Sequence, residues 1–357
     1  MKNLLLIVFL SGMTGILYSQ NSFKESIKDY DHICFCSVGL EHPKDILDMD
    51  NNLEILFGLK NGHTLKELDK FGVKYNQSQI SLLVASGLIE VKDSVFYSTV
   101  PILSKNETIE LRAQTKEIAG NIVPRLQKEY ELLMQTLKIK GLQRNSYSLF
   151  FALVLDGIVW DILEQKGIIK ETIITKEKPF WDGVMWMIEP KRKFSCGTNS
   201  LSSGNFSISV NWSDNSSVSV SSYKMLRKML NDYKENGRVT NPDVFKTFEE
   251  NELFDKKGNL QIPIIKADST DVIYSQSMSI ANIIVQYLNN NIDYSKVLAN
   301  YPNIEKGHAI TILYHEIMWD ILDIMESAGQ IRKPVAFGKP DEIKPGDLKD
   351  LMFIVED

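Results

Sequence analysis

The chain has 357 residues, of which 43% are hydrophobic and 24% are charged, and its formal net charge at pH 7 is -6. This composition excludes an intrinsically disordered chain, and the length is enough for about two domains that each bury their own core. The acidic balance argues against a general polyanion-binding protein, because affinity for nucleic acid depends mostly on cations that neutralise phosphates.

The N-terminus has the layout of a secretory signal. Met1-Lys2-Asn3 precedes an unbroken apolar run from Leu4 to Leu10, and Leu17-Tyr18-Ser19 offers a cleavage site. The run is too short and too interrupted to be a good membrane-spanning helix. We therefore expect a signal peptide at residues 1–20 and a periplasmic or secreted protein that has no membrane span after cleavage. An uncleaved membrane anchor is the alternative.

The sequence contains three cysteines. Cys34 and Cys36 stand at alternate positions of a predicted strand, so their side chains point the same way, whereas Cys196 lies far away along the chain. In an oxidising compartment, one disulfide from Cys196 to either of the others is possible. Three buried free thiols are the alternative, and the sequence leaves the choice open.

The first predicted module covers residues 21–175. A polar arm and a strand near residues 33–38 lead into three short helices, and the second helix starts with the capping-box spacing of Thr64 and Glu67. The turn residues Gly62, Gly72 and Gly87 separate these helices from one another and from two strands after them. The predicted ranges are 52–59, 64–71 and 78–86 for the helices and 88–91 and 95–98 for the two strands.

Three short helices followed by a two-stranded wing resemble a winged helix-turn-helix. Residues 64–99, TLKELDKFGVKYNQSQISLLVASGLIEVKDSVFYST, are similar to the regulator-type version, in which SGLIE joins the third helix to the wing. The resemblance covers roughly 50 residues in each copy and implies a fold. DNA binding would be a separate inference.

An apolar helix that ends in Trp-Asp-Ile-Leu occurs twice. The first copy, residues 149–164, contains Trp160 and Asp161, and the second, residues 308–325, contains Trp319 and Asp320. The first copy is apolar nearly all round, so we expect it to be buried between neighbours. A long amphipathic helix precedes each copy, at 106–137 and 273–288. Such a repeat predicts two similar modules.

The predicted fold is therefore α+β, with two pseudo-repeated winged-helix-like modules and extra long helices around a small shared antiparallel sheet. The second module covers residues 223–357, and a β-hairpin connection covers 176–222. Each copy begins and ends with a strand, so strands near residues 33, 185, 208 and 353 are expected to build the one shared sheet. The Gly/Ser/Asn-rich stretch 195–204 is interpreted as a turn between two strands.

Trp160 and Asp161, with their counterparts Trp319 and Asp320, are the most repeated polar feature. One interpretation is a pair of carboxylates in a cleft between the modules. The other, which we favour, is a buried Asp that satisfies a backbone or Trp donor. His315 lies seven residues after His308 on the same helical face, but Trp319 stands where a His-Glu-x-x-His zinc helix needs its second His. We therefore predict no metal and no cofactor.

A third helix that reads DNA should carry Arg, Lys, Asn or Gln toward the base edges. The first copy offers Asn76, Gln77 and Gln79 but no basic residue between Tyr75 and Gly87. The corresponding stretch of the second copy is acidic and would repel phosphate. Nucleic acid is therefore not an expected partner; a basic surface over Lys60, Lys66, Lys70 and Lys74 would favour it.

The leading hypothesis is an exported binding or structural protein whose winged-helix-like modules contact a protein or a small extracytoplasmic ligand. An enzyme with a carboxylate-lined cleft between the modules is the second hypothesis. A membrane-tethered DNA-binding regulator is the third. The sequence leaves enzymatic activity open.

Overall fold

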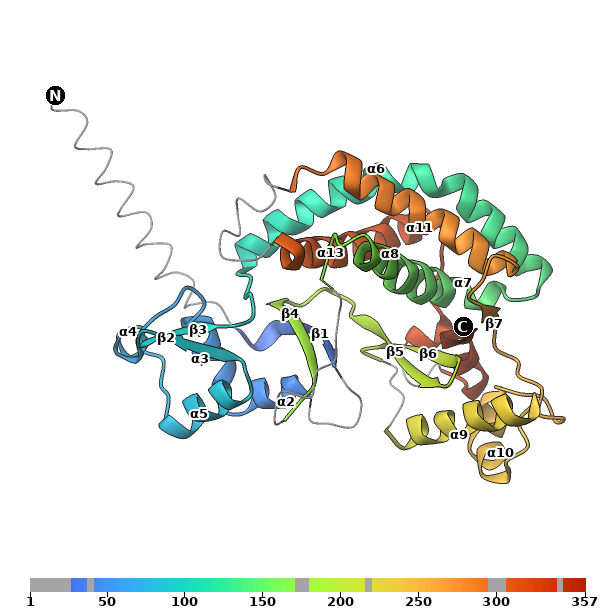
Figure 1. Cartoon of the computed structure of the whole chain (residues 1–357), viewed down its shortest axis with the longest axis horizontal. Coiled ribbons are helices and arrows are strands. Elements are labelled where there is room, and N and C mark those ends of the chain that lie inside the picture. The colour runs from blue at the N-terminus through green and yellow to red at the C-terminus, as the bar shows by residue number, and fades with distance from the viewer. Residues whose placement is uncertain (1–26, 37–41, 171–179, 216–219, 295–305, 339–342) are drawn as a thin grey trace. The chain divides into compact units, whose positions relative to one another are not determined.

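The computed structural model describes residues 27–36, 42–170, 180–215, 220–294, 306–338 and 343–357 (Figure 1). The predicted signal peptide lies outside the described residues. The chain forms two compact units. The first contains Met1–Arg112, Glu171–Lys191 and Asn303–Ile312, and the second contains Ala113–Lys170, Arg192–Pro302 and Leu313–Asp357. The units interleave along the chain, whereas the sequence predicts modules that follow one another.

A two-stranded antiparallel sheet in the first unit joins β1 (Tyr30–Cys36) to β4 (Gly183–Pro190), and a short 3-10 helix (Ile27–Asp29) precedes β1. Ile102 adds a parallel bridge to Ile188 on the other edge of β4. The strands approach closely at Gly183, where a Cβ would lie 2.0 Å from the Phe35 carbonyl oxygen. Glycine is therefore required at this position.

The rest of the first unit follows the predicted order of short helices and hairpin. The capping box of Thr64 and Glu67 is present, and His63 pairs with Phe96 of the hairpin through two backbone hydrogen bonds. The elements are α2 (Pro43–Asp48), α3 (Asn52–Gly58), α4 (Leu65–Lys70), α5 (Gln77–Ala85), β2 (Ile89–Lys92) and β3 (Val95–Ser98). The predicted helices and strands of this stretch are confirmed.

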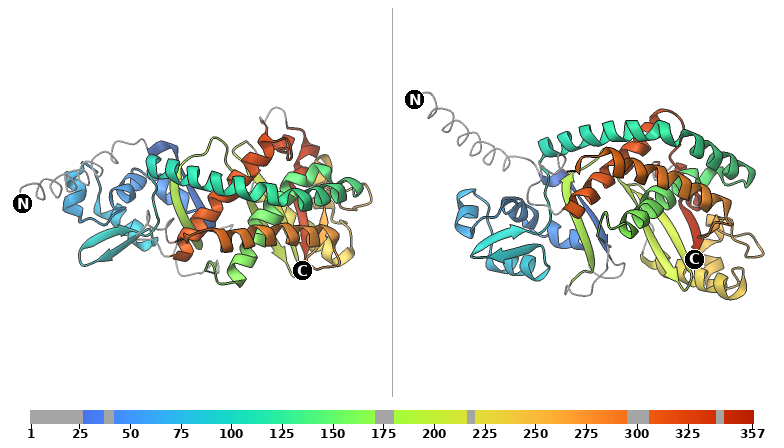
Figure 2. Two further views of the ribbon diagram at one scale, coloured as in Figure 1. Left: turned by 90° about the horizontal axis from the view of Figure 1, so that it is seen from above. Right: turned by 45° about the horizontal axis from the view of Figure 1, so that its top comes forward.

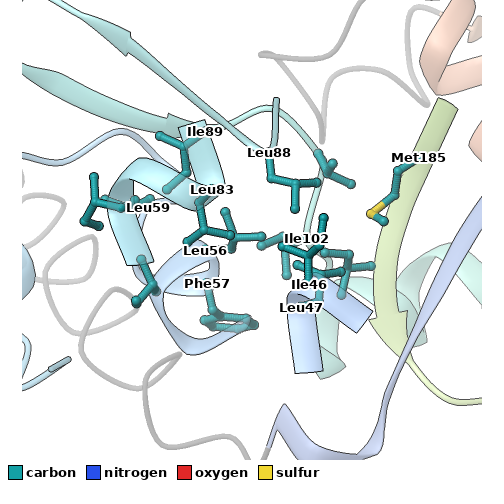
Figure 3. Packing of buried hydrophobic residues seen from close by; sticks show 14 of the residues in the cluster. Ile46, Leu47, Leu56, Phe57, Leu59, Leu83, Leu88, Ile89, Ile102 and Met185 are labelled. Atoms are coloured by element: carbon teal, nitrogen blue, oxygen red, sulfur yellow. The ribbon is translucent and has the colours of Figure 1, made fainter. Parts of the chain in front are cut away.

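One apolar core unites these elements of the first unit. Figure 3 shows residues of α2, α3 and α5 pointing into a common centre, together with Met185 of β4 and with Ile102, which follows the hairpin. Ile46, Leu56 and Leu83 are almost completely buried there. Burying such a side chain contributes roughly 1.5–3 kcal/mol relative to leaving it exposed, so the core is the main source of stability in this unit.

The second unit contains a group of long helices. α6 (Lys105–Ile139) and α13 (Lys306–Ser327) begin in the first unit and continue into the second. α11 lies alongside α8 and the π-helix that precedes it (Figure 2). The remaining elements of this group are a 3-10 helix (Gln143–Asn145), α7 (Ser146–Ser148), the π-helix (Leu149–Ile158), α8 (Val159–Gln165) and α11 (Val272–Asn291).

Among the described residues, one helical stretch, Gln143–Gln165, is long and apolar enough to cross a membrane. Its mean hydropathy is 1.6, and 83% of the apolar window is buried inside the protein. A core helix of a soluble protein passes the same test. The predicted burial of the first Trp-Asp helix is confirmed, because all residues from Leu149 to Leu155 are buried.

A four-stranded sheet lies in the second unit, in the order β5-β6-β8-β7, with β7 parallel to β8 and the other pairs antiparallel. The predicted single shared sheet is therefore wrong, because the strands near residues 33 and 185 pair with each other in the first unit and those near 208 and 353 pair in the second. The strands are β5 (Cys196–Ser203), β6 (Phe206–Ser213), β7 (Ile264–Lys266) and β8 (Met352–Glu356).

The stretch 195–204, predicted as a turn, contains the edge strand β5. Every residue from Cys196 to Ser203 has a partner on β6. Local composition favours turns here, but the backbone groups are satisfied by pairing with the neighbouring strand. Only Gly204 at the end of this stretch makes the turn, with a φ of 61°.

The second unit has two helices before a short turn. α9 and α10 stand before an isolated bridge between Phe254 and Leu260, whereas α3, α4 and α5 of the first unit stand before the β2–β3 hairpin. The Val239 N–H, between the two helices, donates to the Gly258 carbonyl of the turn. The bounds are α9 (Val220–Asn236) and α10 (Pro242–Phe248), with further 3-10 helices at Glu249–Asn251, Val335–Phe337 and Pro345–Leu351.

One parallel contact occurs in the sheet of each unit. Ile102 is bridged in parallel to Ile188 of β4, and β4 pairs antiparallel with β1. Ile264 of β7 pairs in parallel with Ile354 of β8, and β8 pairs antiparallel with β6. β4 and β8 therefore each have one antiparallel partner strand and one parallel contact.

Gly183→Ala should destabilise the protein, because the new Cβ would collide with the Phe35 carbonyl and the φ of 134° is one that alanine rarely adopts. We expect a loss of more than about 1 kcal/mol in the free energy of unfolding. Gly120→Ala is the matched control: it lies inside α6 with open space around it and should stabilise by about 1 kcal/mol. Equal melting temperatures for the two variants would contradict the close approach of β1 and β4.

Candidate functional site

The two repeated tryptophans pack reciprocally in the core of the second unit. Trp160 of α8 contacts Tyr314 of α13 edge to face, with ring centroids 4.8 Å apart. Trp319 of α13 contacts Phe151 of the π-helix at 5.2 Å. Both indoles are buried. Each Trp-Asp helix therefore places its tryptophan against an aromatic ring of the other copy.

The indole N–H groups find their acceptors four residues earlier in the same helix. Trp319 Nε1 donates to His315 Nε2 at 3.4 Å, and Trp160 donates to the Asp156 carboxylate. His315 and Asp156 occupy equivalent positions in the repeat. The aspartates after the tryptophans are predicted to satisfy a backbone or Trp donor. The Trp alternative is wrong, because the indole N–H donates to the residue one helical turn before the tryptophan.

The aspartates after the tryptophans differ in their surroundings. Asp320 is buried and accepts a hydrogen bond from Thr115 Oγ1 at 2.6 Å, whereas Asp161 is exposed. Burial raises the pKa of the Asp320 carboxyl, while Thr115 and Arg192 oppose this shift. The expected burial of both carboxylates is therefore right for Asp320 and wrong for Asp161.

Arg192 lies at the centre of an acidic cluster in the second unit. Its Nη2 is 2.6 Å from a carboxylate oxygen of Glu316 and 3.3 Å from one of Asp320, and its Nη1 is 3.5 Å from Asp323. Glu316 is completely buried. A buried carboxylate is costly unless it is paired. The guanidinium therefore explains why acidic residues lie on the buried face of α13.

The carboxylates of Asp161 and Asp320 have different neighbours. Asp161 interacts with Glu164 and Asp357, and Asp320 with the cluster around Arg192. The different surroundings do not support the hypothesis that the two carboxylates form a catalytic pair. His315 is buried, with Trp319 as its hydrogen-bonded neighbour in the helix, which gives it a structural role that the sequence pattern did not reveal.

Asp156 is a half-buried carboxyl on the π-helix, a kind of helix that is frequent at functional sites. Trp160 donates a hydrogen bond to it, and the Thr198 hydroxyl of β5 forms another. Burial dominates over these bonds and raises the pKa of Asp156 to about 7. Besides burial, the charge of Asp156 also raises the pKa of Tyr314 and the pKa of Cys196.

A second cluster lies in the first unit, where Cys34 and Cys36 of β1 meet His42 at the start of α2. The two sulfurs and a ring nitrogen all lie within 4.8 Å of one another, and Cys34 Sγ is 3.6 Å from His42 Nε2. Hydrogen bonds from Cys34 and then from His42 lower the pKa of Cys36 to about 5, although burial opposes the shift. The hydrogen bond to Cys36 raises the pKa of His42.

All three cysteines are free thiols in this structure. Cys196 is buried on β5 of the second unit, where Tyr147 Oη lies 3.8 Å from its sulfur. Burial raises the pKa of Cys196 to about 12. The hydrogen bond to Cys36, together with burial, raises the pKa of Cys34. Cys196 therefore has the properties of an inert core thiol, and Cys36 has those of a reactive or metal-binding thiol.

The third feature is the outer surface of α5 and the β2–β3 wing in the first unit. Asn76 and Gln79, predicted as possible base-reading residues, form a capping box with each other at the start of α5. The Gln79 amide also donates to Asn51 and Asn52, and Gln79 is buried. Two of the three amides are therefore structural.

The sequence matches no family model, and neither the curated proteins nor the solved structures contain a match to this chain.

Asp320→Leu should lower the free energy of unfolding by about 3 kcal/mol, which is the lower end of the range for removing one partner of a buried ion pair. The loss is at the lower end because Glu316 and Asp323 still face Arg192. Asp320→Asn should cost less, since its amide oxygen still accepts from Thr115. Asp161→Leu and Asp161→Asn should stay within about 0.5 kcal/mol of the parent protein. Chemical denaturation of the four variants measures these differences. Equal losses at both positions would contradict the different roles of the two carboxylates.

Asp156 should make stability fall as pH rises from about 4 to about 7. Its pKa is about 7 in the folded chain against a reference value of 3.8, so the folded state binds more protons than the unfolded state in this window. Above about pH 7 the effect is constant. Asp156→Asn keeps an acceptor oxygen but cannot ionise, so its melting temperature should gain on the parent protein as pH rises. Glu235→Gln, on the exposed face of α9, is the control; parallel curves for the parent protein and Asp156→Asn would refute the assignment.

Proposed function

We propose that the chain is an exported binding protein built from two winged-helix-like modules, and that the first module binds a protein through α5 and the wing. The exposed side chains of α5 carry this proposal, because none of them is charged. They are Gln77, Ser78, Ser81, Val84 and Ala85.

The wing adds exposed apolar side chains beside the exposed ion pair of Glu90 and Lys92. Val91 of β2 and Tyr97 of β3 are exposed, as is Val84 of α5. The Tyr97 ring lies against Gly62, where a Cβ would be 2.1 Å from the ring, so the tyrosine is held in place. Aromatic residues that are held in position are typical of protein-binding surfaces.

Of the basic residues that would favour nucleic acid, Lys60 pairs with Glu107. Lys66, Lys70 and Lys74 are exposed, but they lie on α4 or after it and not on α5 or the wing. Lys92 of the wing pairs with Glu90. Affinity for nucleic acid comes mainly from cations that neutralise phosphates. A protein partner therefore fits this surface better than DNA or RNA does.

The same proposal includes a tandem duplication. Each copy has helices, a wing, and a strand that runs parallel to a late apolar strand, although α4 has no counterpart between α9 and α10. In both copies a residue between the helices bonds to the wing: His63 to Phe96, and Val239 to Gly258. The two tryptophan helices extend this likeness to the second half of each copy.

Export is tested by fractionating cells that express the full chain and measuring the mass of the purified protein. We expect the protein in the extracytoplasmic fraction, with a new N-terminus near residue 20. A cytoplasmic protein that retains Met1 would contradict export and leave the binding surface to be judged separately.

The binding surface is tested with a photo-crosslinking amino acid placed at Val84 or Val91. We expect a crosslinked adduct to the same protein from both positions. A probe at Ile139, the most exposed apolar side chain at the end of α6, is the matched control and should give no such adduct. Equal crosslinking from Ile139, or salt-dependent binding of labelled duplex DNA by the purified protein, would overturn the proposal.

A further inference from the structure

The cluster of Cys34, Cys36 and His42 lies apart from the α5–wing surface and has a chemistry of its own. β1 supplies both thiols, because residues two apart on a strand point to the same side. An irregularity in the pairing of β1 with β4 falls between Ile33 and Cys34, just before the first thiol. The close approach at Gly183 holds the end of β1 that carries Cys36.

His42 is oriented by its role as the N-cap of α2. Its Nδ1 accepts a hydrogen bond from the Lys44 N–H at 3.1 Å, and its backbone N–H donates to Asp45 at 3.3 Å. The first bond holds the ring at the helix end, and the second holds the backbone of the residue that carries it. The opposite ring nitrogen, Nε2, is thereby directed at Cys34, 3.6 Å from its sulfur.

We propose that Cys34, Cys36 and His42 bind one thiophilic transition-metal ion, with zinc(II) as the ion that fits the donor set. Zinc in proteins takes thiolate sulfur at about 2.3 Å and imidazole nitrogen at about 2.0–2.1 Å in tetrahedral geometry. Two such ligands of one ion are therefore about 3.6 Å apart. The separation of Cys34 Sγ and His42 Nε2 is 3.6 Å.

The donor set selects against hard cations. Calcium and magnesium prefer oxygen ligands, whereas two sulfurs and an imidazole suit zinc, cobalt(II) or copper(I). Within the described ranges, no other group of three or more Cys, His, Asp or Glu residues brings its ligand atoms together in this way. The acidic cluster on α13 contains the cation of Arg192, which takes the place that a metal ion would need.

The site is accessible. Cys34 and Cys36 are half-buried and His42 is exposed, so an ion can enter from solvent. Three protein ligands leave the fourth tetrahedral position to water or to a donor from another molecule, as in zinc sites that exchange ligands.

Ion binding has a consequence for α2. A neutral imidazole that binds metal through Nε2 carries its proton on Nδ1, and this nitrogen can no longer accept from the Lys44 N–H. The Asp45 carboxylate, which neighbours His42, is the group that can receive the Nδ1 proton in a hydrogen bond. Loading therefore replaces the side-chain cap of α2 by a carboxylate–histidine–metal contact.

The experiment titrates the reduced, full-length chain with cobalt(II) and then with zinc(II). We expect one equivalent of cobalt to give the charge-transfer absorption of thiolate ligands, and zinc to displace it. Cys34→Ser and Cys36→Ser should each weaken zinc binding by more than about 100-fold, since even loss of an outer-shell group costs about 10–100-fold. Cys196→Ser, which removes the buried thiol of the second unit, should bind like the parent chain.

His42→Asn separates ligation from folding. Asparagine is a good N-cap, so the variant keeps the start of α2 but lacks the ring nitrogen. It should melt like the parent chain without metal and bind zinc at least about 100-fold more weakly. Faster hydrogen exchange at the Lys44 amide on addition of zinc reports the lost cap. Absence of thiolate absorption with cobalt, or equal loss of binding in Cys196→Ser, would overturn the proposal.

Discussion

The second unit depends on the packing of two mostly buried helical segments. The π-helix and α8 form one of them, and the buried part of α13 forms the other. The π-helix is almost entirely apolar, and such a helix is stable only when neighbours cover it on every side. Reciprocal contacts of Trp160 with Tyr314 and of Trp319 with Phe151 join the two copies. Large aromatic side chains contribute much buried area, which explains why the tryptophan recurs in both copies.

Burying these helices also buries polar groups, and each needs a partner. The indole N–H groups are satisfied one turn earlier by Asp156 and His315, and the acidic face of α13 is neutralised by Arg192. A carboxyl and an imidazole can fill the same position because both offer an acceptor to the indole. Both Trp-Asp helices therefore have a hydrogen-bond acceptor four residues before the tryptophan, although the residue type differs.

Much of the local structure follows from the sequence alone. The short helices of the first unit are fixed by their apolar stripes and by signals such as the capping box of Thr64 and Glu67, which act within four residues. The burial of the first Trp-Asp helix follows from its composition. The α+β class follows from the mixture of these helices with alternating strands, and the structure confirms it. These features depend on neighbours close in the chain, so the order of residues is sufficient.

Features that depend on distant partners were decided only by tertiary structure. The Gly/Ser/Asn-rich stretch became β5 because β6 pairs with its backbone, and the strands divided between two sheets. Asp161 and Asp320 follow the same motif, yet only Asp320 meets Thr115 and Arg192, because these partners come from other parts of the chain. The cluster at His42 likewise needs the end of one helix to meet one strand. Sequence spacing determines which face a side chain occupies, whereas packing determines what that face meets.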